Sequence, residues 1–216
     1  MSCAKSQLEQ GLFYPLILGE EVNFRLTYSG PLKAASTSDT RRLDKHAIRA
    51  VFSRQLEQLF KDRDVLIDEF KNERLGESVR AMTRTYRRGP FLCFPLVREE
   101  LNLVCDLDIL FLRREKPGAL VSGGGDIDNR IKVLFDALRV PQDENEVRGL
   151  QPETDDTVLV CLTEDDRLIT GFRVTTDTLL EPPQWASEQN HVQLIINVEV
   201  KATKLTERNM GYFSHF

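Results

Sequence analysis

Three short side chains that carry oxygen atoms stand directly behind three glycines in the stretch GGGDIDNRIK, residues 123–132. They are Asp126, Asp128 and Asn129. An acid at a helix start satisfies free N–H groups and the helix dipole, which explains part of this pattern. Two aspartates and an asparagine together suggest more, because Mg²⁺ is typically held by one or two carboxylates and keeps waters for a phosphate group. The stretch therefore predicts a Mg²⁺ site that handles a phosphate substrate.

The spacing of the residues that follow predicts an amphipathic helix. Apolar side chains recur at helical intervals from Ile127 to Leu138, so we expect a helix that begins at Asp126 or its neighbours and ends near residue 139. Asp128, Lys132 and Asp136 form a second stripe beside the apolar one. The pair of Asp128 and Lys132 also stabilises a helix by itself. A phosphate-binding P-loop is the competing use of the glycines, but the stretch lacks the Gly-Lys-Ser/Thr ending.

A second acidic group is expected near this helix if the site cleaves phosphodiesters. Residues 158–162 (VLVCL) and 168–175 (LITGFRVT) read as the two strands of a hairpin whose tip carries Glu164, Asp165 and Asp166. Such a tip adds a carboxylate to the same cation if the hairpin lies beside the helix. Asp106 and Asp108 alternate with apolar residues in a further strand, which favours a solvated strand face over a second metal site.

The elements that position these residues are predicted by hydrophobic periodicity. We expect strands at 22–28, 101–112 and 192–201, a short edge strand within GPFLCFPL (89–96), and a helix over 46–60 capped by Asp39 or Thr40. Together with the two strands above and the Asp126 helix they predict an α+β fold. We expect one mixed sheet of about five strands with two main helices packed on it.

Composition limits the class of protein. The 216 residues are 41% hydrophobic and 29% charged, which fits one globular domain, and no apolar run reaches the length of a membrane span, so a cytoplasmic protein is expected. The four cysteines are widely spaced and fit neither a zinc site nor a disulfide framework, so reduced thiols are expected.

The net charge of −5 argues against a protein that coats nucleic acid by bulk attraction, although basic residues gather in one region. The candidate contacts to DNA phosphates are Arg41, Arg42, Lys45, Arg80, Arg84, Arg87 and Arg88. A solvated helix face with ordinary ion pairs is the alternative explanation for this charge.

The two acidic motifs resemble the RusA family of Holliday junction resolvases. That family has the pattern D-x-D-N-x-x-K-x-x-x-D-A-L followed by D-D-x-x-V/I, and the chain carries DIDNRIKVLFDAL from Asp126 and DDRLI from Asp165. The resemblance implies that Asp126, Asp128 and Asp166 bind the metal and that Lys132 is catalytic. Asn129, Asp136 and Asp165 are expected to support these residues without binding the metal directly.

The resemblance also implies a function and partners. Members of the family are homodimers that bind branched DNA and cut four-way junctions with Mg²⁺, so a role in DNA recombination and repair is expected; Mn²⁺ is a possible substitute. The order of the expected elements over residues 22–203 is similar to that of the family.

The chain departs from compact family members by added segments. These are an N-terminal extension (1–20), insertions near 61–95 and 140–157, and a C-terminal tail (205–216). The insertion at 140–157 is acidic and would repel DNA unless it folds away from the site. A non-catalytic module for nucleic-acid or protein binding on the same fold is therefore the alternative function. A nucleotide phosphohydrolase, which would need a closed pocket, is more distant.

Overall fold

The computed structural model describes residues 22–34, 38–62, 86–114, 127–152, 158–180 and 190–206, with residues 209 and 213. It confirms the α+β class, with two helices and two sheets among these residues. None of the helices in these ranges is long and apolar enough to cross a membrane.

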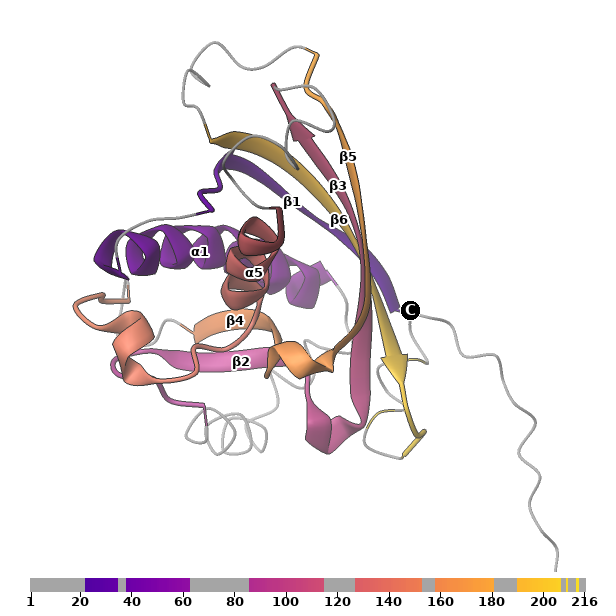
Figure 1. Ribbon diagram of the computed structural model, residues 1–216. Helices are drawn as coiled ribbons and strands as arrows, with labels where there is room; N and C mark the ends of the chain where they lie inside the picture. Colours follow the sequence, from indigo (N-terminus) through magenta and orange to yellow (C-terminus); the bar gives the residue numbers. More distant parts are fainter. Residues whose placement is uncertain are drawn as a thin grey trace, which may run out of the picture.

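The main sheet has four strands. In spatial order they are β1 (Val22–Pro31), β6 (His191–Ala202), β3 (Leu103–Arg113) and β5 (Ile169–Thr178). The pairs β1–β6 and β6–β3 are antiparallel, and β5 runs parallel to β3. Figure 1 shows both helices on one side of this curved sheet. We call that side the inner face and the opposite side the outer face.

Alternation along the strands creates the two faces. Leu103, Cys105, Leu107, Ile109 and Phe111 of β3 are buried on the inner face, whereas Asp106 and Asp108 point to the outer face. This arrangement agrees with the predicted solvated strand face at Asp106 and Asp108.

The second sheet has two parallel strands, β2 (Leu92–Val97) and β4 (Val158–Thr163). The predicted hairpin of β4 and β5 is therefore wrong, because these strands belong to different sheets. The short 3-10 turn η3 (Asp166–Leu168) leads the chain from β4 into β5. The strands predicted within GPFLCFPL and at 158–162 are present, and β4 is almost completely buried.

The helices α1 (Ser38–Asp62) and α5 (Ile127–Leu138) fill the space between the sheets. Ile48, Phe52, Leu56 and Phe60 of α1 recur every four residues and are buried, as are Ile131, Leu134 and Leu138 of α5. The helix α1 begins eight residues before the predicted start. Asp39 and Thr40 therefore lie within its first turn, and the prediction that one of them caps the helix is wrong.

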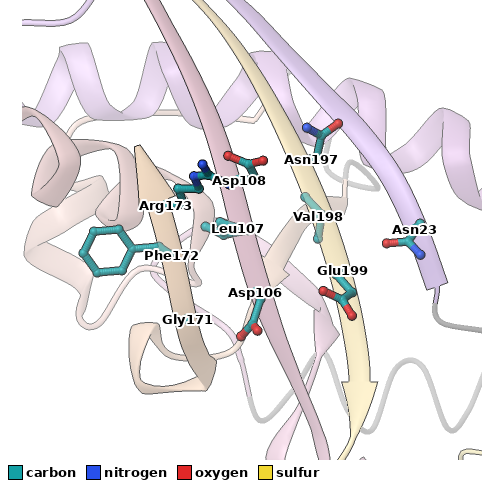
Figure 2. Close-up of a pocket in the computed structure, with 10 residues that line it drawn as sticks. All are labelled: Asn23, Asp106, Leu107, Asp108, Gly171, Phe172, Arg173, Asn197, Val198 and Glu199. Carbon is teal, nitrogen blue, oxygen red and sulfur yellow. The ribbon is translucent and has the colours of Figure 1, made fainter. Parts of the chain in front are cut away.

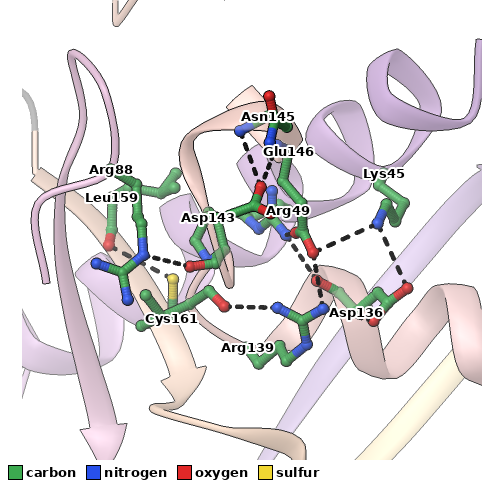
Figure 3. Close-up of polar contacts among 12 residues, drawn as sticks. Lys45, Arg49, Arg88, Asp136, Arg139, Asp143, Asn145, Glu146, Leu159 and Cys161 are labelled. Carbon is green, nitrogen blue, oxygen red and sulfur yellow. Dashed lines mark hydrogen bonds and ion pairs between the residues drawn. The ribbon is translucent and has the colours of Figure 1, made fainter. Parts of the chain in front are cut away.

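A buried ionic cluster joins the two helices to the turn η2 (Glu144–Val147), as Figure 3 shows. Its members are Lys45 and Arg49 of α1, Asp136 of α5, Arg139, and Glu146 of η2. Arg139 Nη2 lies 2.8 Å from both Asp136 Oδ1 and Glu146 Oε1. Arg49 Nη2 donates to the main-chain oxygen of Asp136 at 2.6 Å and lies 3.3 Å from Glu146 Oε2. The described part of the acidic insertion is thus held against the core.

The three described cysteines, Cys93, Cys105 and Cys161, are buried and free, in agreement with reduced thiols. Two tail residues contact the same domain. Asn209 is fully buried and donates to the main-chain oxygen of Leu101 at 2.7 Å, and Phe213 packs against the main core.

Candidate functional site

The start of α5 presents Asp128 and Lys132 to solvent, and a buried arginine fixes its position. Both side chains are exposed and lie one helical turn apart. Arg130, between them in sequence, is 5% exposed and donates to the main-chain oxygen of Leu32 and to Asn190 Oδ1. Leu32 follows β1 and Asn190 precedes β6, so these hydrogen bonds attach the first turn of α5 to the main sheet. The position of Asp128 is therefore set by the fold.

Asp166 is exposed at the start of η3, in a turn stabilised by its neighbours. Asp165 caps this turn by accepting a hydrogen bond from the Arg167 N–H at 3.0 Å. Glu164 accepts from the Glu99 N–H at 3.1 Å, and Arg167 pairs with Glu99. Leu168 is buried beneath the turn. The direction of Asp166 is therefore fixed by a hydrogen-bonded turn.

These two elements meet at one pocket of 640 Å³. It is lined by Asp128, Lys132 and Asp166, with Ile127, Ile131, Phe135, Phe172 and Val174 as its apolar wall. The structure thus brings together three of the four residues predicted to form the site. Asp126, the fourth, lies outside the described residues, as do the three glycines.

The donor set in this pocket suits a hard cation. Two carboxylates, Asp128 and Asp166, face the same space as the ammonium group of Lys132. Within the described ranges no group of three or more His, Cys, Asp or Glu is arranged to hold a metal ion. Oxygen ligands of this kind are those that Mg²⁺ and Mn²⁺ accept.

Two of the three residues predicted to support the metal ligands have structural roles. Asp136 belongs to the buried ionic cluster, and Asp165 caps η3. Asn129 is exposed in the first turn of α5.

Sequence reasoning missed two aromatic residues of the pocket. Phe172 of β5 has 59% of its surface exposed although it lies on the inner face, and its ring meets Phe135 of α5 edge-on with centroids 5.2 Å apart. In β5, Phe172 shares the inner face with Val174. Its exposure follows from the position of β5 at the edge of the sheet, which the local sequence does not encode.

The residues predicted to bind DNA differ in their exposure to solvent. Arg41 and Arg87 are exposed, whereas Arg42 and Arg88 are half-buried; Arg88 donates to the main-chain oxygen of Pro141 at 2.7 Å. Lys45 is 9% exposed and pairs with Asp136 and Glu146, so it is not available to a DNA phosphate. Arg80 and Arg84 lie outside the described residues.

A polar hollow on the outer face is the other notable cluster of charge (Figure 2). Asp106 accepts from Lys201 Nζ at 2.8 Å, and this hydrogen bond holds the pKa of Asp106 below its usual range. A side chain at Gly171 would place its Cβ 2.9 Å from Asp106 Cγ, so only glycine leaves room for that carboxylate. These contacts neutralise Asp106, in accord with a solvated strand face.

Comparison with known proteins gives no further guide to this site, because no protein-family model, no curated protein and no solved structure matches the chain.

Proposed function

We propose that this protein is a Mg²⁺-dependent, structure-selective endonuclease that hydrolyses phosphodiesters in branched DNA, with Mn²⁺ as a possible substitute. The observation that carries the proposal is the meeting of Asp128, Lys132 and Asp166 in one pocket, from two elements far apart in sequence. The two motifs that resemble the RusA family supply these residues, and the packing of α5 and η3 against the main core accounts for their meeting.

The roles of the residues follow from their charge. Asp128 and Asp166, with Asp126, would hold the cation through carboxylate oxygens. When bound, a divalent cation neutralises charge on the phosphate and lowers the pKa of a bound water. Lys132 supplies a fixed positive charge on the same wall, where it can pair with a phosphate oxygen and stabilise the charge that develops during hydrolysis.

The apolar wall supports a nucleic-acid substrate. Phe172 offers an exposed ring beside the charged groups, and aromatic rings of this kind bind unpaired bases by stacking. Bases beside a branch point are unstacked more easily than bases in a continuous duplex, because the continuous stack is interrupted there. A ring beside the cleavage site therefore suits branched DNA.

The position of the acidic insertion supports catalysis over a non-catalytic module. Residues 140–152 do not line the pocket, and Glu146 points into the buried ionic cluster instead. Val140 and Val147 are buried in a small second core. The described part of this insertion therefore leaves the approach to Asp128 and Asp166 open to a substrate.

The test is cleavage of an end-labelled four-way junction, with duplex and single-stranded DNA of the same sequences as controls. We expect cutting of the junction with Mg²⁺, none with EDTA, and a loss of about 100-fold or more in the Asp128→Asn variant. Asp108→Asn is the matched control, because it makes the same change at an exposed carboxylate on the outer face. It should cut like the wild type.

Two results would contradict the proposal. Cleavage that persists in Asp128→Asn or in EDTA would place the activity elsewhere. Tight binding of the junction without cutting, by a folded protein with Mg²⁺ present, would favour the alternative of a non-catalytic binding module.

A further inference from the structure

The two edges of the main sheet differ in how their main-chain groups are satisfied. At the β1 edge, the side chain of Gln55 acts like a neighbouring strand. Its Oε1 accepts from the Thr27 N–H at 2.9 Å, and its Nε2 donates to the Thr27 oxygen at 2.7 Å. A side chain of α1 thus occupies the middle of this edge and blocks the pairing of another strand.

The β5 edge has no such cover from the described residues. Among the described strands, only β3 pairs with β5. The N–H of Leu179 bonds to the oxygen of Arg113, so the odd-numbered residues of β5 direct their main-chain groups toward β3. Val174 and Thr176 therefore direct theirs away from the sheet, where they can pair with a further strand.

The side chains of β5 carry complementary charges that are symmetric about Thr175. Arg173, Thr175 and Asp177 are exposed on the outer face. Figure 2 shows Arg173 on this face beside the hollow. Within the described part of the chain, no hydrogen bond or ion pair joins Arg173 to another residue, and the N–H of the adjacent Thr178 is the one donor to Asp177. The positive charge of Arg173 thus lies two residues before Thr175, and the negative charge of Asp177 lies two residues after it.

From these observations we infer that β5 pairs with β5 of a second copy of this chain. The strands are antiparallel, with the two-fold axis beside Thr175, and the two sheets join into one of eight strands. Arg173 then lies opposite the partner's Asp177, and Asp177 lies opposite the partner's Arg173. Val174 and the partner's Thr176 exchange main-chain hydrogen bonds.

The charges also exclude other registers. In an antiparallel pair, two directly opposite residues lie on the same face of the sheet. A two-fold axis midway between two consecutive residues would pair residues from different faces, so the axis must pass beside one residue. An axis at Arg173 or at Asp177 would bring two like charges together. Axes at Val174 and at Thr176 leave both charges without an opposite partner. Within β5, the register centred on Thr175 is the one that forms two ion pairs.

The first test is the oligomeric state of charge variants, measured by size-exclusion chromatography with light scattering. We expect a dimer for the wild type, and monomers for Arg173→Asp and for Asp177→Arg, because each places like charges opposite each other twice. The double variant Arg173→Asp/Asp177→Arg should restore the dimer. Arg54→Asp, an exposed site on α1, is the control and should stay dimeric.

The second test is disulfide cross-linking in a Cys3→Ser background, since the other cysteines are buried. The two copies of residue 175 form a pair without main-chain hydrogen bonds, with Cα atoms about 4.5 Å apart. That separation falls within the range of disulfides. Thr175→Cys should therefore cross-link on mild oxidation, and Thr27→Cys, at the covered β1 edge, should not.

A wild type that stays monomeric, or a dimer that survives both single charge reversals, would overturn the inference. A dimer in which Thr175→Cys fails to cross-link would refute the register. Neither test depends on the proposed nuclease activity.

Discussion

At the scale of single residues, Phe172 is the side chain that we expect to contact DNA bases. It leaves 59% of its surface exposed, beside three charged groups. We predict that Phe172→Ala weakens the binding of a four-way junction about tenfold to a hundredfold, because base stacking on an aromatic ring contributes ~1–3 kcal/mol. Phe172→Trp should retain the affinity.

Fluorescence anisotropy of a labelled junction in EDTA measures this affinity without cleavage. Leu180→Ala is the matched control, since Leu180 is 92% exposed and is not part of the pocket. Equal binding by wild type and Phe172→Ala would mean that the ring has no contact with DNA.

His46 makes the stability of the fold depend on pH. Burial, with a smaller effect of Arg49, lowers the pKa of His46 from 6.5 to about 4. The unfolded chain therefore takes up this proton at a higher pH than the folded chain. The stabilisation is complete above pH 6.5 and is lost as the pH falls toward 4.

Urea unfolding at a series of pH values tests this effect. His46→Phe keeps a ring beside Phe91, which lies 5.0 Å from the His46 ring, and it removes the titration. We expect its free energy of unfolding to fall less than that of the wild type between pH 6.5 and 4. Parallel pH profiles of the two proteins would rule out His46 as the source.

The sequence predicted the candidate site better than it predicted the roles of individual charges. Asp128, Lys132 and Asp136 form one stripe by spacing, yet only the first two reach the pocket. Asp136 is drawn into the ionic cluster by Arg139 and Lys45. Its partners come from α1 and from beyond the end of α5, so the pattern within one helix could not distinguish it from Asp128.

At the scale of elements, the ionic cluster connects α1, α5 and η2. Glu146 has contacts with Lys45, Arg49 and Arg139, three cations of which two are almost fully buried. We predict that Glu146→Gln lowers the free energy of unfolding by ~3 kcal/mol, because it leaves buried positive charge without its partner.

Urea denaturation measures this change, and Glu144→Gln is the control. Glu144 precedes Glu146 in the same turn but is exposed, so its substitution should alter stability by less than about 0.5 kcal/mol. Equal effects of the two variants would show that the cluster does not hold the insertion in place.

The positions of most elements could be read from the sequence, but not the partners of every strand. Periodicity predicted β1, β3, β6 and α5 closely, since each carries a complete apolar pattern. The turn between β4 and β5 is short and acidic, which fits a hairpin as well as it fits η3. The choice is made by distant contacts, because β4 pairs with β2 and β5 pairs with β3.

At the scale of the whole molecule, the inferred β5–β5 pairing would place the two proposed nuclease sites on one side of a continuous sheet. The axis of this pairing would be perpendicular to the sheet, so both inner faces would stay on the same side. Phe172 would lie opposite the partner's Thr178, which would separate the two copies of Phe172 by about 20 Å along the strands. Two sites so arranged can act on two strands of one branch point.

We therefore predict that dimer formation determines whether one strand or two are cut. On a supercoiled plasmid with an extruded cruciform, the wild type should produce linear DNA, because both strands are cut in one encounter. The monomeric Arg173→Asp variant should produce nicked circles, and Arg173→Asp/Asp177→Arg should restore linear product. Linear product from a proven monomer would show that paired cutting does not need the β5 interface. If no variant cuts, the nuclease proposal fails while the dimer remains open to its own tests.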